Sequence, residues 1–137
     1  MTVNPSVSAL GIFIAWTLLL LLLMETGRSF LVLSRRKQSN EFKPDNSNLS
    51  PFMQRLARAH ANCVEGFPIF GGLLLIAIST GRQYVTDPLA YWLVAARVAQ
   101  SIVHLMSLSV LAVNVRFALF VVQIIIAMWW VWSLVVV

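Results

Sequence analysis

The longest uncharged stretches of the sequence constrain the fold most. Residues 1–24 and 117–137 contain no charged side chain. Runs of about 20 apolar residues match the thickness of the hydrocarbon core of a bilayer. Hydrophobic residues make up 59% of the 137-residue chain and charged residues only 11%, so a soluble globule of this size could not cover its surface with polar groups. We therefore interpret the chain as an integral membrane protein.

The order of apolar and polar segments predicts an all-α, multi-pass four-helix bundle in a single domain, residues 1–137. Helices satisfy their own backbone hydrogen bonds in lipid, and four of them pack as a bundle. Helix-start signals are "NPS" before the first span, Ser50–Pro51 before the second and Asp87–Pro88 before the third. The expected spans cover approximately residues 6–33, 51–79, 88–108 and 113–135.

Basic residues predict the orientation in the membrane. Arg35, Arg36, Lys37 and Lys43 lie in the first loop, whereas Arg82 alone lies in the second. The positive-inside rule places the first and third connections in the cytoplasm and both termini outside. The first apolar run lacks a basic n-region and an A-x-A cleavage pattern, so we expect a retained helix rather than a signal peptide. A bacterial inner membrane and the endoplasmic reticulum fit equally well.

Several functional classes are disfavoured by the residues present. The formal charge of +5 is carried beside the spans, where topology explains it better than nucleic-acid binding does. The two histidines and Cys63 are too widely spaced to predict a metal site. Cys63 is alone, cannot form an internal disulfide, and is expected to pack as a small hydrophobe. No Ser-His-Asp or Cys-His arrangement for nucleophilic catalysis is present.

Polar side chains recur at helical spacing inside three of the predicted spans. Successive helical residues advance by about 100°, so positions three or four apart share a face. Each set forms one polar stripe: Arg55, Arg58, Asn62 and Glu65 on the second helix, Arg97, Gln100 and His104 on the third, and Arg116 with Gln123 on the fourth.

The depths of these residues predict their partners. With a rise of about 1.5 Å per residue, Glu65 and Arg97 lie at similar depths, roughly 15 Å from the cytoplasmic ends of their helices. A lone charge at the bilayer centre costs about 2.5–3.5 kcal/mol on insertion scales, so we expect these two residues to pair or to share a partner. Glu25 and Arg28 are expected to form a similar local pair. Pro68 should kink the second helix.

The balance of charge points to an anionic ligand. Several arginines surround the inner half of the predicted bundle, against the single carboxylate of Glu65. Guanidinium groups bind carboxylates in a bidentate manner, so this arrangement suits a small anion in a cavity open to the cytosol. The alternatives are that Arg55 and Arg58 are interfacial anchors, or that Glu65 and Arg97 only hold the helices together.

A longer motif resembles a known family. The segment "RAHANCVEGFPIF", from Arg58 to Phe70, resembles the membrane-associated proteins in eicosanoid and glutathione metabolism, the MAPEG family. The shared positions are Arg58, Asn62, Glu65 and Pro68. Two shorter blocks also match, "ARVAQSIVH" with Arg97 and "VRFALF" with Arg116.

This resemblance implies a homotrimer that binds glutathione as co-substrate between subunits, near the cytosolic side. Carried over by position, the glutathione-binding candidates are Arg58, Asn62, Glu65, Arg97, His104 and Arg35 (or Arg36). Arg116 would stabilise the thiolate as the catalytic residue. The second substrate would be a hydrophobic electrophile or lipid hydroperoxide that arrives from the membrane lipid. Gln100, Phe117 and Phe120 depart from the eicosanoid isomerases, so we expect a transferase or peroxidase instead.

Two other functions remain open on the sequence. A non-catalytic, lipid-binding or scaffolding member of the same family would use the polar stripes only for assembly. An ion or solute carrier is less favoured, because the short chain shows no inverted repeat and no pair of broken helices.

Overall fold

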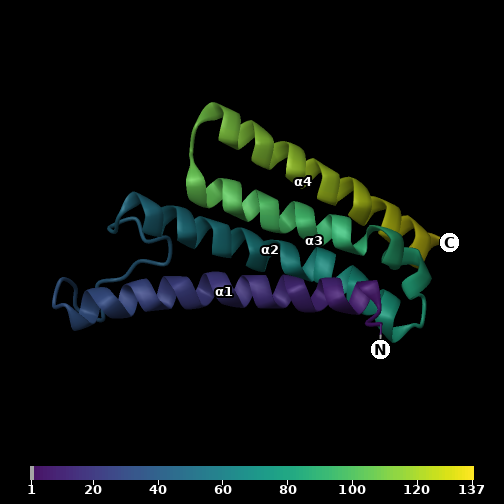
Figure 1. Ribbon diagram of the computed structural model, residues 1–137, viewed down its shortest axis with the longest axis horizontal. Helices are drawn as coiled ribbons and strands as arrows, with labels where there is room; N and C mark the ends of the chain where they lie inside the picture. Colours follow the sequence, from purple (N-terminus) through teal and green to yellow (C-terminus); the bar gives the residue numbers. More distant parts are fainter. Residues whose placement is uncertain (1) are drawn as a thin grey trace.

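A computed structural model describes residues 2–137 as four long helices (Figure 1). These are α1 (Pro5–Leu33), α2 (Pro51–Ser79), α3 (Gln83–Met106) and α4 (Val110–Val131), and α4 continues into a π-helical turn, η1 (Trp132–Val136). All four helices are long and apolar enough to cross a membrane, and the described residues form no strand. The predicted fold class, an all-α membrane four-helix bundle, is confirmed.

The helices are arranged side by side, with α2 and α3 between α1 and α4 (Figure 1). The first loop (residues 34–50) and the α3–α4 connection lie at one end of the bundle. Both termini and the short α2–α3 turn lie at the other end. α4 packs mainly on α3 and only weakly on α2. This asymmetry leaves room for a cleft between α2 and α4.

Three of the helices begin with a side-chain N-cap. The Asn4 side chain accepts hydrogen bonds from the backbone N–H of Ser6 and of Val7, at 2.9 and 3.3 Å. Ser50 Oγ accepts from Met53 N at 3.3 Å, and Ser109 Oγ accepts from Ala112 N at 3.2 Å. Such caps satisfy N–H groups that have no partner within their own helix.

The third helix begins at Gln83, five residues earlier than the Asp87–Pro88 signal predicted. Gly81, at φ +68°, makes a tight left-handed turn after α2, and α3 starts almost at once. Asp87 therefore does not cap its own helix. Its carboxylate accepts from Asn4 Nδ2 at 2.9 Å, Ser6 N at 3.1 Å and Ser6 Oγ at 2.6 Å, so it caps α1 from a neighbouring helix.

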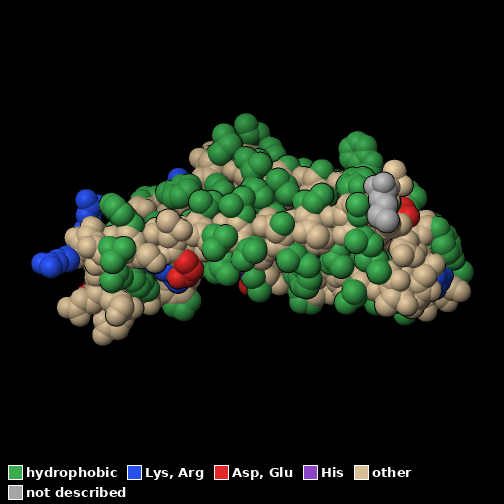
Figure 2. Space-filling model, turned by 60° about the horizontal axis from the view of Figure 1, so that its bottom comes forward, with side chains coloured by type: hydrophobic (Ala, Val, Ile, Leu, Met, Phe, Trp, Pro, Cys, Tyr) green, Lys and Arg blue, Asp and Glu red, His purple; other side chains and the backbone are tan. Residues whose placement is uncertain are grey.

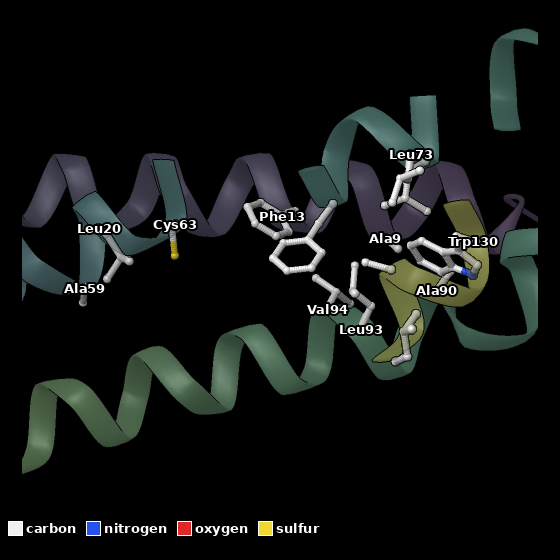
Figure 3. Close-up of a cluster of buried hydrophobic side chains, with 14 of the residues drawn as sticks. Ala9, Phe13, Leu20, Ala59, Cys63, Leu73, Ala90, Leu93, Val94 and Trp130 are labelled. Atoms are coloured by element: carbon white, nitrogen blue, oxygen red, sulfur yellow. The ribbon is translucent and has the colours of Figure 1, made fainter. Parts of the chain in front are cut away.

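The core runs along the centre of the bundle and is built from residues of α1, α2 and α3, joined near the C-terminus by residues of α4 and η1 (Figure 3). Phe13, Leu20, Leu93 and Trp130 are completely buried. Cys63 is buried among them, with its Sγ 3.4 Å from Ser101 Oγ. Large apolar side chains also cover much of the outside, as a lipid-facing surface requires (Figure 2).

An arginine ties the first loop to the bundle. Arg28 donates to Asn46 Oδ1 from Nε at 3.0 Å and from Nη2 at 2.7 Å, and it forms the expected ion pair with Glu25 at 3.2 Å. Asn46 is buried at φ 54°, and its Nδ2 donates to the Met53 carbonyl of α2 at 2.8 Å. The loop is thus bound to both α1 and α2.

Candidate functional site

Arg97 lies in the interior of the bundle with unused hydrogen-bonding capacity. Its side chain is only 1% exposed, and its guanidinium carbon lies 5.6 and 5.3 Å from the ring centroids of Phe13 and Phe70. Nη1 donates to the Asn62 carbonyl at 3.4 Å, whereas Nε and Nη2 have no partner among the described residues, 2–137. Unpaired buried donors are costly, so these N–H groups are poised for an acceptor that the chain itself does not supply.

Gly66 makes the space that this guanidinium occupies. A Cβ atom at position 66 would lie 2.8 Å from Arg97 Nη2 and 3.2 Å from the Phe70 ring. Glycine inside a helix is unfavourable by about 1 kcal/mol relative to alanine, which marks a position with a packing requirement. Gly66 was not among the predicted site residues, although its place one residue after Glu65 was an available signal.

A cleft of about 530 Å³ opens beside Arg97, between α2, α3 and α4. Among its lining residues Asn62, Glu65 and Arg97 are polar. Most of the other walls are apolar and come from α2, α4 and η1: Ile69, Phe70, Phe120, Ile124, Met128 and Trp132. The cleft thus combines a small polar region with a long apolar wall, which is the usual composition of a small-molecule site.

Glu65 and Arg97 share this cleft without touching. Within residues 2–137, the ion pairs are Arg28 with Glu25 and Lys37 with Glu41. The expectation of a direct Glu65–Arg97 ion pair is therefore wrong for the single protomer. The reason is that Arg97 points inward and lies beside the rings of Phe13 and Phe70, while Glu65 is exposed on the surface of α2. A shared partner would have to enter the cleft.

A second cluster of candidate residues lies near the loop end of the bundle. His104 is buried, and neither of its ring nitrogens has a partner. Arg116, Arg58 and Arg55 are close enough to act on it electrostatically. Arg55 Nε donates to the Leu105 carbonyl at 2.9 Å, and Arg116 Nε is buried without a partner. This cluster is cationic and, like Arg97, offers unpaired donors.

A pair of glutamines joins α3 to α4 between the cleft at Arg97 and the cationic cluster at His104. Gln123 Nε2 donates to Gln100 Oε1 at 2.8 Å, and both side chains are buried. Gln100 stands on α3 between Arg97 and His104, so the polar stripe of this helix is continuous from the cleft to the cationic cluster. The stripes on α3 and α4 therefore face each other.

Arg35 stands apart from the other candidates. It follows the end of α1 and lines a separate pocket of about 380 Å³ with Arg36 and Lys37. The structure thus brings Asn62, Glu65 and Arg97 together, gathers Arg58, His104 and Arg116 near the loop end, and does not bring Arg35 to either group within one protomer. No group of three His, Cys, Asp or Glu side chains suited to a metal ion occurs in the described part of the chain.

Four helices long and apolar enough to cross a membrane, with a cleft between three of them, define a polytopic membrane protein. The MAPEG family model matches residues 6–136, nearly the whole length. The chain belongs to the MAPEG family. No curated protein and no solved structure matches it significantly.

Proposed function

We propose that the protein is a glutathione-dependent membrane enzyme, a transferase or peroxidase acting on a hydrophobic electrophile or a lipid hydroperoxide. Family membership supports this class of activity. The observation that carries the proposal is Arg97, which lines the cleft with two unpaired nitrogen donors beside Asn62 and Glu65.

The chemistry of glutathione matches these groups. The tripeptide carries carboxylates and an ammonium group. Arg97 offers parallel N–H donors for a carboxylate, and Glu65 offers a counter-charge for the ammonium group. Arg58 and His104 add donors nearer the loop end, and Arg116 would favour the thiolate, as nearby cations do for thiols in general. The thiolate sulfur would then form a bond to an electrophilic carbon, displacing a leaving group or a π electron pair, or to a peroxide oxygen, breaking the O–O bond and releasing an alcohol. No protein nucleophile is needed.

We further propose that the protein is a homotrimer with its ligand near the subunit boundary. Glu65 and Arg58 are both exposed on α2 within a membrane-spanning helix. An ionised side chain facing lipid is costly, whereas a neighbouring protomer or a bound ligand would cover it. In such an assembly Arg35 would reach glutathione only from the adjacent protomer. The basic first loop favours a cytoplasmic location for that end of the bundle, in a bacterial inner membrane or the endoplasmic reticulum.

Thiolate formation tests the proposed activity. Glutathione added to the purified protein is expected to develop thiolate absorbance in the ultraviolet at neutral pH. Arg116→Ala should remove this signal while glutathione still binds, because the cation that favours the ionised sulfur is lost. Calorimetric titration of both proteins separates binding from ionisation. Absence of glutathione binding to the unaltered protein contradicts the proposed function, and an undiminished thiolate signal in Arg116→Ala contradicts the role of Arg116.

Gly66 offers a test of how Arg97 is positioned. Gly66→Ala is expected to weaken glutathione binding about tenfold, roughly the loss of one hydrogen bond to a charged group. The added methyl group would push Nη2 out of its place. Gly72→Ala is the matched control, because a Cβ atom at position 72 meets nothing within 4 Å. Calorimetric titration of both variants measures the effect, and equal affinities for the two would argue against this placement of Arg97.

The apolar walls of the cleft favour a second candidate function, lipid binding without turnover. Most lining residues are apolar, and an acyl chain would fill that wall without any need for glutathione. In that case glutathione would neither raise the melting temperature nor bind in the calorimeter. Glu65→Gln would then reduce the stability of the assembly and change nothing else.

A further inference from the structure

Three consecutive cations surround a small pocket at the end of α1. Arg35, Arg36 and Lys37 follow the last helical residue and line a pocket of about 380 Å³, to which Val32 contributes an apolar wall. Figure 2 shows basic side chains protruding at this end of the molecule. The pocket is separate from the cleft beside Arg97, and of its lining residues only Arg35 has a part in the proposed function.

The backbone turns sharply to place these cations together. Arg35 adopts a left-handed conformation, φ 60°. The N–H groups of Arg36 and Lys37 both donate to the Leu31 carbonyl, at 3.0 and 3.2 Å, which closes the end of α1. A non-glycine residue rarely adopts this conformation, so the turn is specific. It keeps the three side chains around one hollow.

The three positive charges of the pocket are only partly neutralised by neighbouring carboxylates. Lys37 pairs with Glu41 at 3.9 Å, and this is the sole ion pair among the pocket residues. Arg36 lies over the ring of Phe30, 5.7 Å from its centroid. Phe30 and Leu33 are exposed by 59% and 83%, and both belong to the last turn of a membrane-spanning helix. Cations and exposed apolar groups therefore lie side by side at the end of a helix that is long and apolar enough to cross a membrane.

We propose that this pocket binds the phosphate of an anionic phospholipid, with Phe30 and Leu33 against its acyl chains. Arginine suits phosphate because its planar N–H groups bind phosphate oxygens in pairs. The adjacent apolar side chains distinguish a lipid from a free phosphate. A basic cluster directly beside a membrane span is the arrangement that recognises anionic headgroups.

Native mass spectrometry of the detergent-solubilised protein with short-chain phosphatidylglycerol tests the proposal. Each lost cation should weaken binding about fivefold, so Arg36→Gln with Lys37→Gln is expected to weaken it roughly 25-fold. Lys43→Gln is the matched control, since Lys43 lies in the same loop outside the pocket. Circular dichroism and the melting temperature verify that each variant is folded.

Three results would overturn the proposal. The first is retention of phosphatidylglycerol by the double variant, and the second is an equal loss with Lys43→Gln, which would indicate only a diffuse charge effect. The third is displacement of the lipid by inorganic phosphate at equal concentration, which would indicate a site for soluble phosphate. Phosphatidylcholine is expected to bind more weakly than phosphatidylglycerol, because its choline ammonium offsets the charge of its phosphate.

Discussion

Arg97→Met is expected to lower the affinity for glutathione at least 100-fold without lowering the melting temperature of the ligand-free protein. Hydrogen bonds to charged groups contribute about 1.5–3 kcal/mol each, and Arg97 offers two unpaired donors to the cleft. The ligand-free protein is expected to be at least as stable after the change. Replacement of an incompletely paired buried charge by an apolar side chain is often neutral or stabilising. Calorimetric titration measures the first effect and thermal unfolding the second.

Arg97→Lys serves as the control for this experiment. Lysine keeps the positive charge but loses the planar donor geometry and the contact of the guanidinium with the rings of Phe13 and Phe70. The affinity of the Arg97→Lys variant for glutathione is expected to lie between those of the unaltered protein and the Arg97→Met variant. Unchanged affinity in Arg97→Met, together with a marked loss of thermal stability, would show that Arg97 is a structural element of the bundle.

The second large effect is expected at Asp87, which connects α3 to the start of α1. Asp87→Ala should lower the free energy of unfolding by about 3 kcal/mol, because buried polar groups lose a charged partner. The substitution removes three hydrogen bonds, from Asn4 Nδ2, Ser6 N and Ser6 Oγ. Ser6 is completely buried, and after the substitution its hydroxyl would keep its contact with Thr86 Oγ1 while its N–H would keep the Asn4 side chain. Denaturant unfolding in detergent micelles measures the change.

Asp45→Ala is the matched control for the stability measurement. Asp45 is exposed in the first loop, where its side chain accepts only from Ser47 N at 3.0 Å. This hydrogen bond holds the pKa of Asp45 below its ordinary value. Loss of such an exposed contact is expected to change the unfolding free energy little. If Asp87→Ala and Asp45→Ala unfold at the same denaturant concentration, the proposed connection between α1 and α3 is not important for stability.

Much of the candidate site could be found from the spacing of polar residues along the helices. Its division into the cleft at Arg97, the cluster around His104 and the separate pocket at Arg35 could not. Helical periodicity correctly placed Arg97, Gln100 and His104 along one face of α3, which the structure buries. Periodicity says nothing about which way a long side chain bends once a neighbouring helix is present. Arg97 bends toward Phe13 and Phe70, which are far from it in sequence, and so forms no direct ion pair with Glu65.

The sequence by itself determined the four apolar spans, the helix starts at Asn4 and Ser50, and the local pair of Glu25 with Arg28, because each depends on residues only a few positions apart. The tertiary structure alone decided that Asp87 caps α1, that Gly66 makes room for Arg97, and that Arg35 lies in a different pocket from Arg97. These contacts join residues from different helices, or depend on how the helices pack. Their energies depend on the distances between helices, which no local pattern in the chain specifies.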